Sequence, residues 1–179
     1  IPEVLDYFSK EIELKKETLY NCKMVQAQDG VSVESDTLGA LLYPLEGDTF
    51  ALDMVIKPER YHEFGIALHV DKELETGYFL RMNPKNQLVA WDMWPRGEQG
   101  RYQWQIKGDV PYQIETARKL PKAEEYRVHI IKEKDICVVY INDEIVLSTR
   151  MYNHKDGYAG IYVVQGDVKL IQYKEKRSE

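Results

Sequence analysis

The chain has 179 residues and a formal net charge of −6 at pH 7, with 44% hydrophobic and 30% charged residues. This length and composition are typical of one soluble globular domain with a full core, and they exclude a disordered chain. The negative charge disfavours binding to nucleic acid or to an anionic membrane surface, so we expect neither as a partner.

The first twenty residues, IPEVLDYFSKEIELKKETLY, mix acidic residues with lysines and contain the one segment where a short helix is expected. We assign residues 1–20 to a linker or lead-in segment, helical or extended, that follows something upstream. Residues 21–179 are assigned to the folded domain, because from about residue 22 the pattern changes to short alternating runs.

These runs alternate apolar and polar residues with period two and are separated by turn residues every ~8–12 residues, which predicts strands. The run DTFALDMVIKP, residues 48–58, should stop at Pro58. Asn142 with Asp143 should form the tight turn of a hairpin, since both residue types tolerate positive φ. We therefore expect an all-β fold of roughly ten strands, a two-layer antiparallel β-sandwich of the jelly-roll or concanavalin-like type. The positions that should face its core are Phe50, Leu52, Met54, Ile56, Phe64, Ile66, Leu68, Val70, Tyr78, Leu80, Met82, Tyr126, Val128 and Ile130.

Motifs for nucleophilic catalysis, nucleotide hydrolysis and dinucleotide binding are absent from the sequence. The four histidines lack the i,i+2 or i,i+4 spacing of a metal site, and Glu73 with Glu75 lies in a charged loop where solvated side chains are expected. We predict no catalytic residues and no cofactor, with a structural calcium ion at the acidic loop 71–75 as the one alternative. A disulfide between Cys22 and Cys137 is left open.

The stretch NQLVAWDMWPR, residues 86–96, places a carboxylate between two tryptophans. The strand period directs Val89, Trp91 and Met93 to one face, which is apolar and fits the core. Asp92 and Trp94 then share the opposite face, and Pro95 ends the strand so that Arg96 lies at its rim. An aromatic ring beside groups that bind hydroxyls is the combination that holds sugars.

Other runs offer matching outward groups. The non-core faces carry Glu63, Ala67 and His69 in one strand and Phe79 and Arg81 in another, and the second arm of the hairpin adds Arg150 and Tyr152. If these strands share a sheet, its open face combines small residues with acids, arginines and aromatics. The alternative interpretation is an ordinary exposed face with cross-strand ion pairs. Our candidate ligand-binding residues are Glu63, Arg81, Asp92, Trp94, Arg96, Arg150 and Tyr152.

Three separated motifs occur in the order of a known family. They are DMWPR at 92–96, CVVYIND at 137–143 and STRMY at 148–152, within a region of roughly residues 48 to 171. This region resembles the C-terminal β-sandwich of glycoside hydrolase family 32 enzymes, and it is most similar to carbohydrate-binding module family 66.

The resemblance implies a non-catalytic module that binds fructans, the terminal fructose of levan or inulin, and targets a glycoside hydrolase in the same parent chain. It also implies an extracellular or cell-surface location, although the sequence leaves a cytoplasmic one open. Two alternatives are kept: a structural sandwich that braces a catalytic propeller without binding sugar, and a sandwich glycosidase in its own right.

Overall fold

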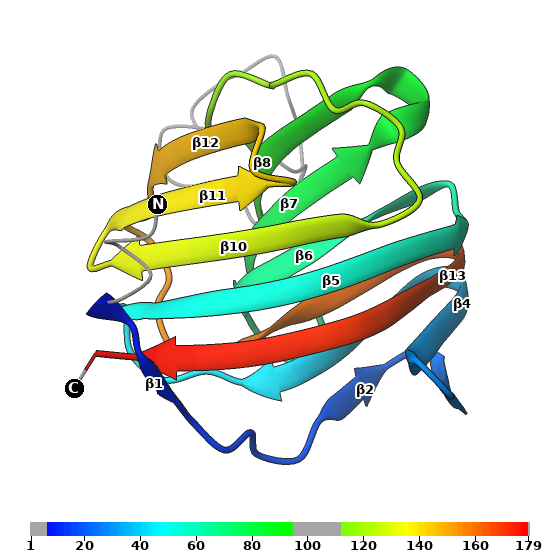
Figure 1. Cartoon of the computed structure of the whole chain (residues 1–179), viewed down its shortest axis with the longest axis horizontal. Helices are drawn as coiled ribbons and strands as arrows, with labels where there is room; N and C mark the ends of the chain where they lie inside the picture. Colours follow the sequence, from blue (N-terminus) through cyan, green and yellow to red (C-terminus); the bar gives the residue numbers. More distant parts are fainter. Residues whose placement is uncertain (1–6, 95–111, 179) are drawn as a thin grey trace.

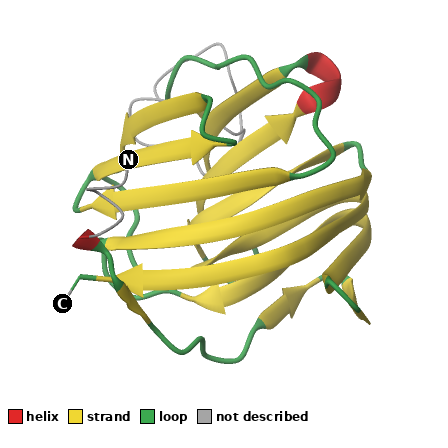
Figure 2. Ribbon diagram, in the orientation of Figure 1, coloured by secondary structure: helices red, strands yellow, loops and turns green. Residues whose placement is uncertain are grey.

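The computed structural model describes residues 7–94 and 112–178, and nearly all regular structure in these ranges is β-strand (Figure 2). One short 3-10 helix, η1, spans Pro84–Asn86. The strands are β1 (Lys10–Glu11), β2 (Thr18–Tyr20), β3 (Lys23–Ala27), β4 (Gly30–Pro44), β5 (Phe50–Arg60), β6 (Glu63–Val70), β7 (Gly77–Asn83), β8 (Leu88–Trp94), β9 (Tyr112–Gln113), β10 (Tyr126–Glu133), β11 (Ile136–Ile141), β12 (Ile145–Arg150) and β13 (Tyr158–Arg177).

The strands pair antiparallel in the order β12-β11-β10-β5-β13-β6-β7-β8-β9. Because β13 pairs with β5 through its second half and with β6 through its first half, the sheet folds over into two layers. The first layer contains β12, β11, β10 and β5, which lie side by side across the front of Figure 1. The second layer contains β6, β7, β8 and β9, and β2 extends it through β4. The expected two-layer antiparallel sandwich is confirmed.

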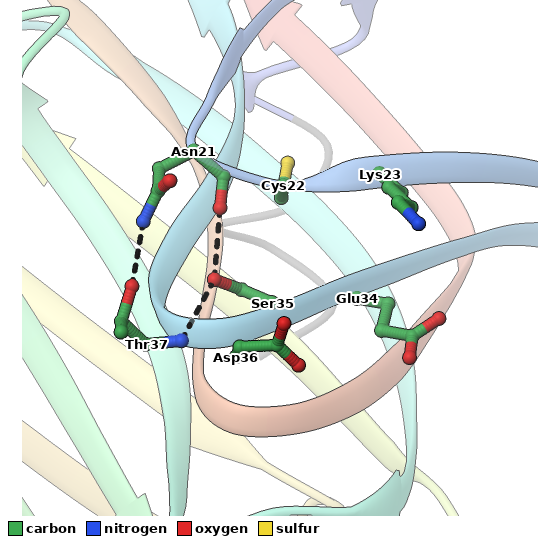
Figure 3. Close-up of a pocket in the computed structure, with 7 residues that line it drawn as sticks. All are labelled: Asn21, Cys22, Lys23, Glu34, Ser35, Asp36 and Thr37. Atoms are coloured by element: carbon green, nitrogen blue, oxygen red, sulfur yellow. Dashed lines mark hydrogen bonds between the residues drawn. The ribbon is translucent and has the colours of Figure 1, made fainter.

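The long strands β4 and β13 bend where they pass from one layer to the other. The register between them shifts between Val164 and Gly166, and Gln165 at this point has φ 51°. The opposite bend, in β4, is held by side chains (Figure 3): the Ser35 hydroxyl donates to the carbonyl of Asn21 at 2.8 Å, and the Asn21 amide donates to the Thr37 hydroxyl at 2.7 Å. A β-bulge fixed in this way turns a strand sharply.

The core lies between the layers, and the period-two prediction describes it well. Val128 and Ile130 from the first layer and Leu80 and Trp91 from the second all have 0% exposed surface. The predicted core positions of β5, β7, β8 and β10 are all buried, and they belong to one apolar cluster. Alternation of burial along a strand is therefore sufficient to orient most of these side chains.

The period fails at the end of β6. His69 has φ 54°, and the register with β13 shifts at Tyr158, so the chain turns over there. Val70, expected in the main core, instead joins the apolar cluster on the outer face of the second layer, and His69, expected outside, is 3% exposed beside Phe50. The prediction that this strand stops at Pro58 was wrong, since β5 continues to Arg60. Pro58 lies at a register shift with β13, where the missing N–H donor of proline is tolerated.

The lead-in segment contains no helix between Phe8 and Tyr20, and two short parts of it belong to the sheet. Lys10 and Glu11 pair with the end of β13, and Thr18 to Tyr20 pair with β4. The hairpin turn is confirmed, with Asn142 and Asp143 at φ 52° and 57°. Cys22 and Cys137 are both free thiols, so the disulfide left open by the sequence is not formed.

Candidate functional site

The candidate site lies on the outer face of the second layer, where five strand pairings place six side chains in one row. This row runs across β2, β4, β13, β6, β7 and β8, and it consists of Tyr20, Ala40, Tyr162, Gly65, Arg81 and Ala90. The next row places Asp92 opposite Phe79 on β7 and opposite Gln113 on β9. Small residues alternate with aromatic and charged ones, so the face is hollowed.

Gly65 is essential to this hollow. A Cβ atom at position 65 would lie 2.8 Å from the ring of Tyr162 and 1.9 Å from the carbonyl oxygen of Leu80. Only glycine leaves room for the Tyr162 ring to lie across β6. The result is a groove of ≈ 380 Å³, lined by Tyr20, Leu38, Glu63, Glu73, Leu74, Glu75, Phe79, Asp92, Trp94, Tyr162 and Val164.

The polar centre of the site is a two-point ion pair. Arg81 Nε donates to Asp92 Oδ2 at 2.9 Å, and Arg81 Nη2 lies 3.4 Å from Asp92 Oδ1. The same Nη2 donates to the side-chain carbonyl of Gln113 at 3.2 Å. Because Asp92 is only 9% exposed, the guanidinium holds its carboxylate in a fixed orientation at the groove wall.

Glu63 is another carboxylate in the lining of the groove, and it is held differently from Asp92. The Tyr162 hydroxyl donates to Glu63 Oε2 at 3.3 Å. Burial raises the pKa of Glu63, the nearby charge of Arg81 opposes this, and Asp92 raises it further. Burial likewise raises the pKa of Tyr162 well above its usual range, and the Glu63 charge adds to that shift, so the phenol stays protonated as a donor. Glu63 thus keeps acceptor capacity directed to the groove.

Aromatic and aliphatic side chains form the rest of the lining. Phe79 packs edge-on against Tyr162, with ring centroids 5.6 Å apart and an interplanar angle of 86°. Trp94 lines the groove close to Asp92 and is partly exposed. Aromatic faces beside fixed carboxylates can hold the C–H surface of a sugar while its hydroxyls donate to the oxygens.

Four of the seven candidate residues therefore come together: Glu63, Asp92 and Trp94 line the groove, and Arg81 holds Asp92. Sequence reasoning missed Tyr162, which is central to the site. The run GYAGIYVV carried a usable signal, since Ala159, Ile161 and Val163 alternate with Tyr162 and place it on the outer face. Tyr20, Leu38 and Leu74 also line the groove. They reach it through the pairing of distant strands and through a loop, so no local sequence pattern predicts their place.

Arg150 and Tyr152 do not join this site. β12 lies at the far end of the sheet order from β7 and β8, so its outward side chains belong to the other layer. Arg150 pairs with Asp135 at 3.3 Å, and Tyr152, 72% exposed, borders a separate pocket at the end of the sandwich. Arg96 lies outside the described residues.

The acidic loop at 71–75 is where the sequence offered a calcium ion as an alternative. In the structure the Asp71 carboxylate of this loop accepts hydrogen bonds from the backbone of the loop itself. Asp71 Oδ1 accepts from the backbone N–H groups of Glu75 at 2.7 Å and Thr76 at 2.8 Å. Within residues 7–94 and 112–178, no three His, Cys, Asp or Glu side chains gather to hold a metal ion. None of the helical residues in these ranges forms a segment with the length and apolarity that a membrane span requires.

No protein-family model matches the sequence, and no curated protein matches it. Solved structures do match the fold. Carbohydrate-binding module CBM66 from Bacillus subtilis superposes with a TM-score of 0.74 at 17% identity, over 91% of this chain and 96% of that one. A candidate glycosyl hydrolase from Parabacteroides distasonis superposes with a TM-score of 0.61 at 16% identity, over 91% and 88% of the two chains.

The exoplasmic/lumenal domain of VIP36, in a form with Ca²⁺ and Man3GlcNAc bound, also superposes, with a TM-score of 0.61 at 10% identity over 91% and 84%. At such identities the likeness establishes the fold and nothing finer. The fold implied by the resemblance to carbohydrate-binding module family 66 is confirmed, and the attribution to a family 32 C-terminal module stays a prediction. The chain therefore has the β-sandwich fold that carbohydrate-binding modules and lectin-like domains share.

Proposed function

We propose that the chain is a non-catalytic carbohydrate-binding module whose ligand occupies the groove on the second layer. The observation that carries this proposal is the joint presence of the Arg81–Asp92 pair, Glu63 and the ring of Trp94 around one cavity of ≈ 380 Å³. A cavity of this size accommodates a small ligand, and its lining matches the amphipathic surface of a sugar. The net charge of −6 favours a neutral one.

The finer proposal is that the sugar is a terminal fructose of levan or inulin. It is supported by the motifs at 92–96, 137–143 and 148–152, and by the fold shared with carbohydrate-binding module CBM66. In this proposal the module targets a glycoside hydrolase in the same parent chain and acts outside the cell. Binding of one sugar unit is weak, because few atoms are buried and the hydroxyls must lose water.

Affinity electrophoresis in gels that contain levan, inulin or a β-glucan tests the proposal. We expect the fructans alone to retard the wild-type chain, and Trp94→Ala and Glu63→Gln to abolish the retardation. Tyr7→Ala is the matched control, because this aromatic is exposed and lines neither the groove nor the pocket that Tyr152 borders. Retardation by the β-glucan alone would overturn the fructan assignment but not sugar binding; no retardation by any polysaccharide would overturn both and favour the bracing role.

A glycosidase is the second candidate, because Glu63 and Asp92 place two carboxylates on strands of the groove and burial raises the pKa of Glu63, as in a general acid. Against it, Asp92 is bound at two points by Arg81 and is not a free nucleophile or base. We expect no release of fructose from levan or inulin, measured by chromatography after prolonged incubation. Release that Glu63→Gln abolishes would replace the module with an enzyme.

A further inference from the structure

A second pocket, distinct from the groove, opens at the end of the sandwich and has a volume of ≈ 550 Å³. Its lining comes from the two residues that precede β5, from the end of β10 and the turn to β11, and from the segment that follows β12. We refer to it as the end pocket. Three lysines line it, namely Lys132, Lys134 and Lys155, together with two aspartates, Asp48 and Asp135.

Lys132 is the unusual residue in this set. It continues the core-facing period of Val128 and Ile130 along β10, and it is only 1% exposed. Its neighbours in register are Phe50 and Cys137, and its ammonium lies 5.9 Å from the centre of the Phe50 ring. Among the described residues no carboxylate lies within 4.0 Å of it, although an unpaired buried charge is costly.

The acids of the end pocket do not neutralise this charge at close range. Asp135 is already paired with Arg150 at 3.3 Å, and Asp48 accepts from the hydroxyl of Thr49 at 3.2 Å. Burial lowers the pKa of Lys132, whereas the more distant charges of Asp48 and Asp135 raise it. Lys134 and Lys155 are exposed at the pocket and add two more cations. The end pocket is therefore electropositive around a buried donor.

His69 does not supply a further cation to this region. It packs edge-on against Phe50 with centroids 5.5 Å apart. Burial first, and then the charge of Lys132, lower the pKa of His69 to about 4. The imidazole is thus neutral at ordinary pH, and among the described residues Lys132 is the buried side chain that carries a positive charge.

We propose that the end pocket binds an oxyanion, a carboxylate, sulfate or phosphate group, with the Lys132 ammonium as the central donor and Lys134 and Lys155 at its mouth. An oxyanion there gives the buried ammonium the charge-assisted hydrogen bonds that the described residues do not supply. The exposed ring of Tyr152 borders the same pocket and offers a face to a sugar that carries the anion. This site is independent of the groove and of the function proposed for it.

Isothermal titration calorimetry of the intact chain, at constant ionic strength, tests the proposal with sodium phosphate, sodium sulfate and sodium glucuronate, and with glucose as the neutral counterpart. We expect saturable one-to-one binding of at least one anion and none of glucose. Tighter binding of glucuronate than of phosphate or sulfate supports an acidic sugar as the source of the anion, and the reverse order supports a free oxyanion. Absence of binding by all three anions would overturn the proposal.

Variants locate the binding. Lys132→Met keeps the apolar stem and removes the charge, and it should weaken anion binding roughly 10- to 100-fold, the effect of one charge-assisted hydrogen bond. Lys119→Met, at an exposed lysine outside the pocket, should leave binding unchanged. The double variant Lys134→Ala/Lys155→Ala alters exposed positions only, so it should fold and bind the anion more weakly even if Lys132→Met does not fold. Wild-type affinity in both Lys132→Met and Lys134→Ala/Lys155→Ala would refute the site.

Discussion

Removal of the Arg81 guanidinium should destabilise the fold more than removal of any surface arginine. The Arg81–Asp92 pair has a 2.9 Å contact, and its side chains are 25% and 13% exposed. At an effective dielectric constant of about 20 the attraction is about 6 kcal/mol. The desolvation of both groups offsets much of this, and Arg81→Met leaves Asp92 buried without its cation and near Glu63. We expect a net loss of about 2 kcal/mol, or about 4–8 °C in melting temperature.

The chain contains a matched control for this change. Arg150 contacts Asp135 at 3.3 Å, but those side chains are 56% and 35% exposed. In water-like surroundings the attraction is about 1 kcal/mol, and side-chain entropy removes most of it. Arg150→Met should therefore cost less than about 0.5 kcal/mol.

Urea unfolding followed by tryptophan fluorescence at neutral pH gives both free energies of unfolding by linear extrapolation. The double variant Arg81→Met/Asp92→Asn separates the causes, because it removes the buried carboxylate as well and should recover part of the loss. Equal losses for Arg81→Met and Arg150→Met would refute the argument from burial. A double variant no more stable than Arg81→Met would show that the unpaired carboxylate is not the source of the cost.

Two further predictions concern other parts of the sandwich. The Asp53 carboxylate, 2.6 Å from His129 Nδ1, raises the pKa of His129 above the ordinary 6.5, so the bridge contributes fully below that pH and is lost as the pH rises through the folded-state pKa. His129→Gln should therefore cost about 1 kcal/mol near pH 5 and almost nothing near pH 9 in urea unfolding; an equal cost at both would contradict the linkage. Gly65→Ala places a Cβ against the Leu80 carbonyl and the Tyr162 ring, and it should lower stability by roughly 2–3 kcal/mol in a thermal melt and weaken sugar retardation. A melting temperature within 1–2 °C of wild type would show that the floor of the groove has room to spare.

Local pattern carried the prediction of the fold a long way. Trp91 is fully buried while Asp92 is held at the groove by Arg81, as the alternation in NQLVAWDMWPR requires. The positive-φ turn at Asn142 and Asp143 is equally local, because it depends on the residues in the turn itself. These features depend on the two-residue repeat of a strand and on turn chemistry, both of which are written into neighbouring residues.

The site was predictable only in part. Glu63, Arg81 and Asp92 lie on strands adjacent in sequence, and hairpin-connected strands usually pair, so their outward side chains meet. Arg150 has the same outward pattern but lies on β12, in the other layer, and alternation along one strand contains no information about which layer it joins. His69 and Val70 exchange faces because His69 adopts a left-handed backbone conformation. A histidine in the sequence does not predict that conformation.

The sequence by itself determined the all-β class, the faces of most strands, and the placement of an acid and a tryptophan together on one face. The tertiary structure alone decided that β13 crosses between the layers, which brings Tyr162 beside Glu63 over the gap left by Gly65. It also decided that Lys132, on the core-facing side of β10, is buried and lines the end pocket. The physical reason is that orientation within a strand is fixed by neighbours in sequence, whereas strand order depends on pairings between residues as far apart as 65 and 162.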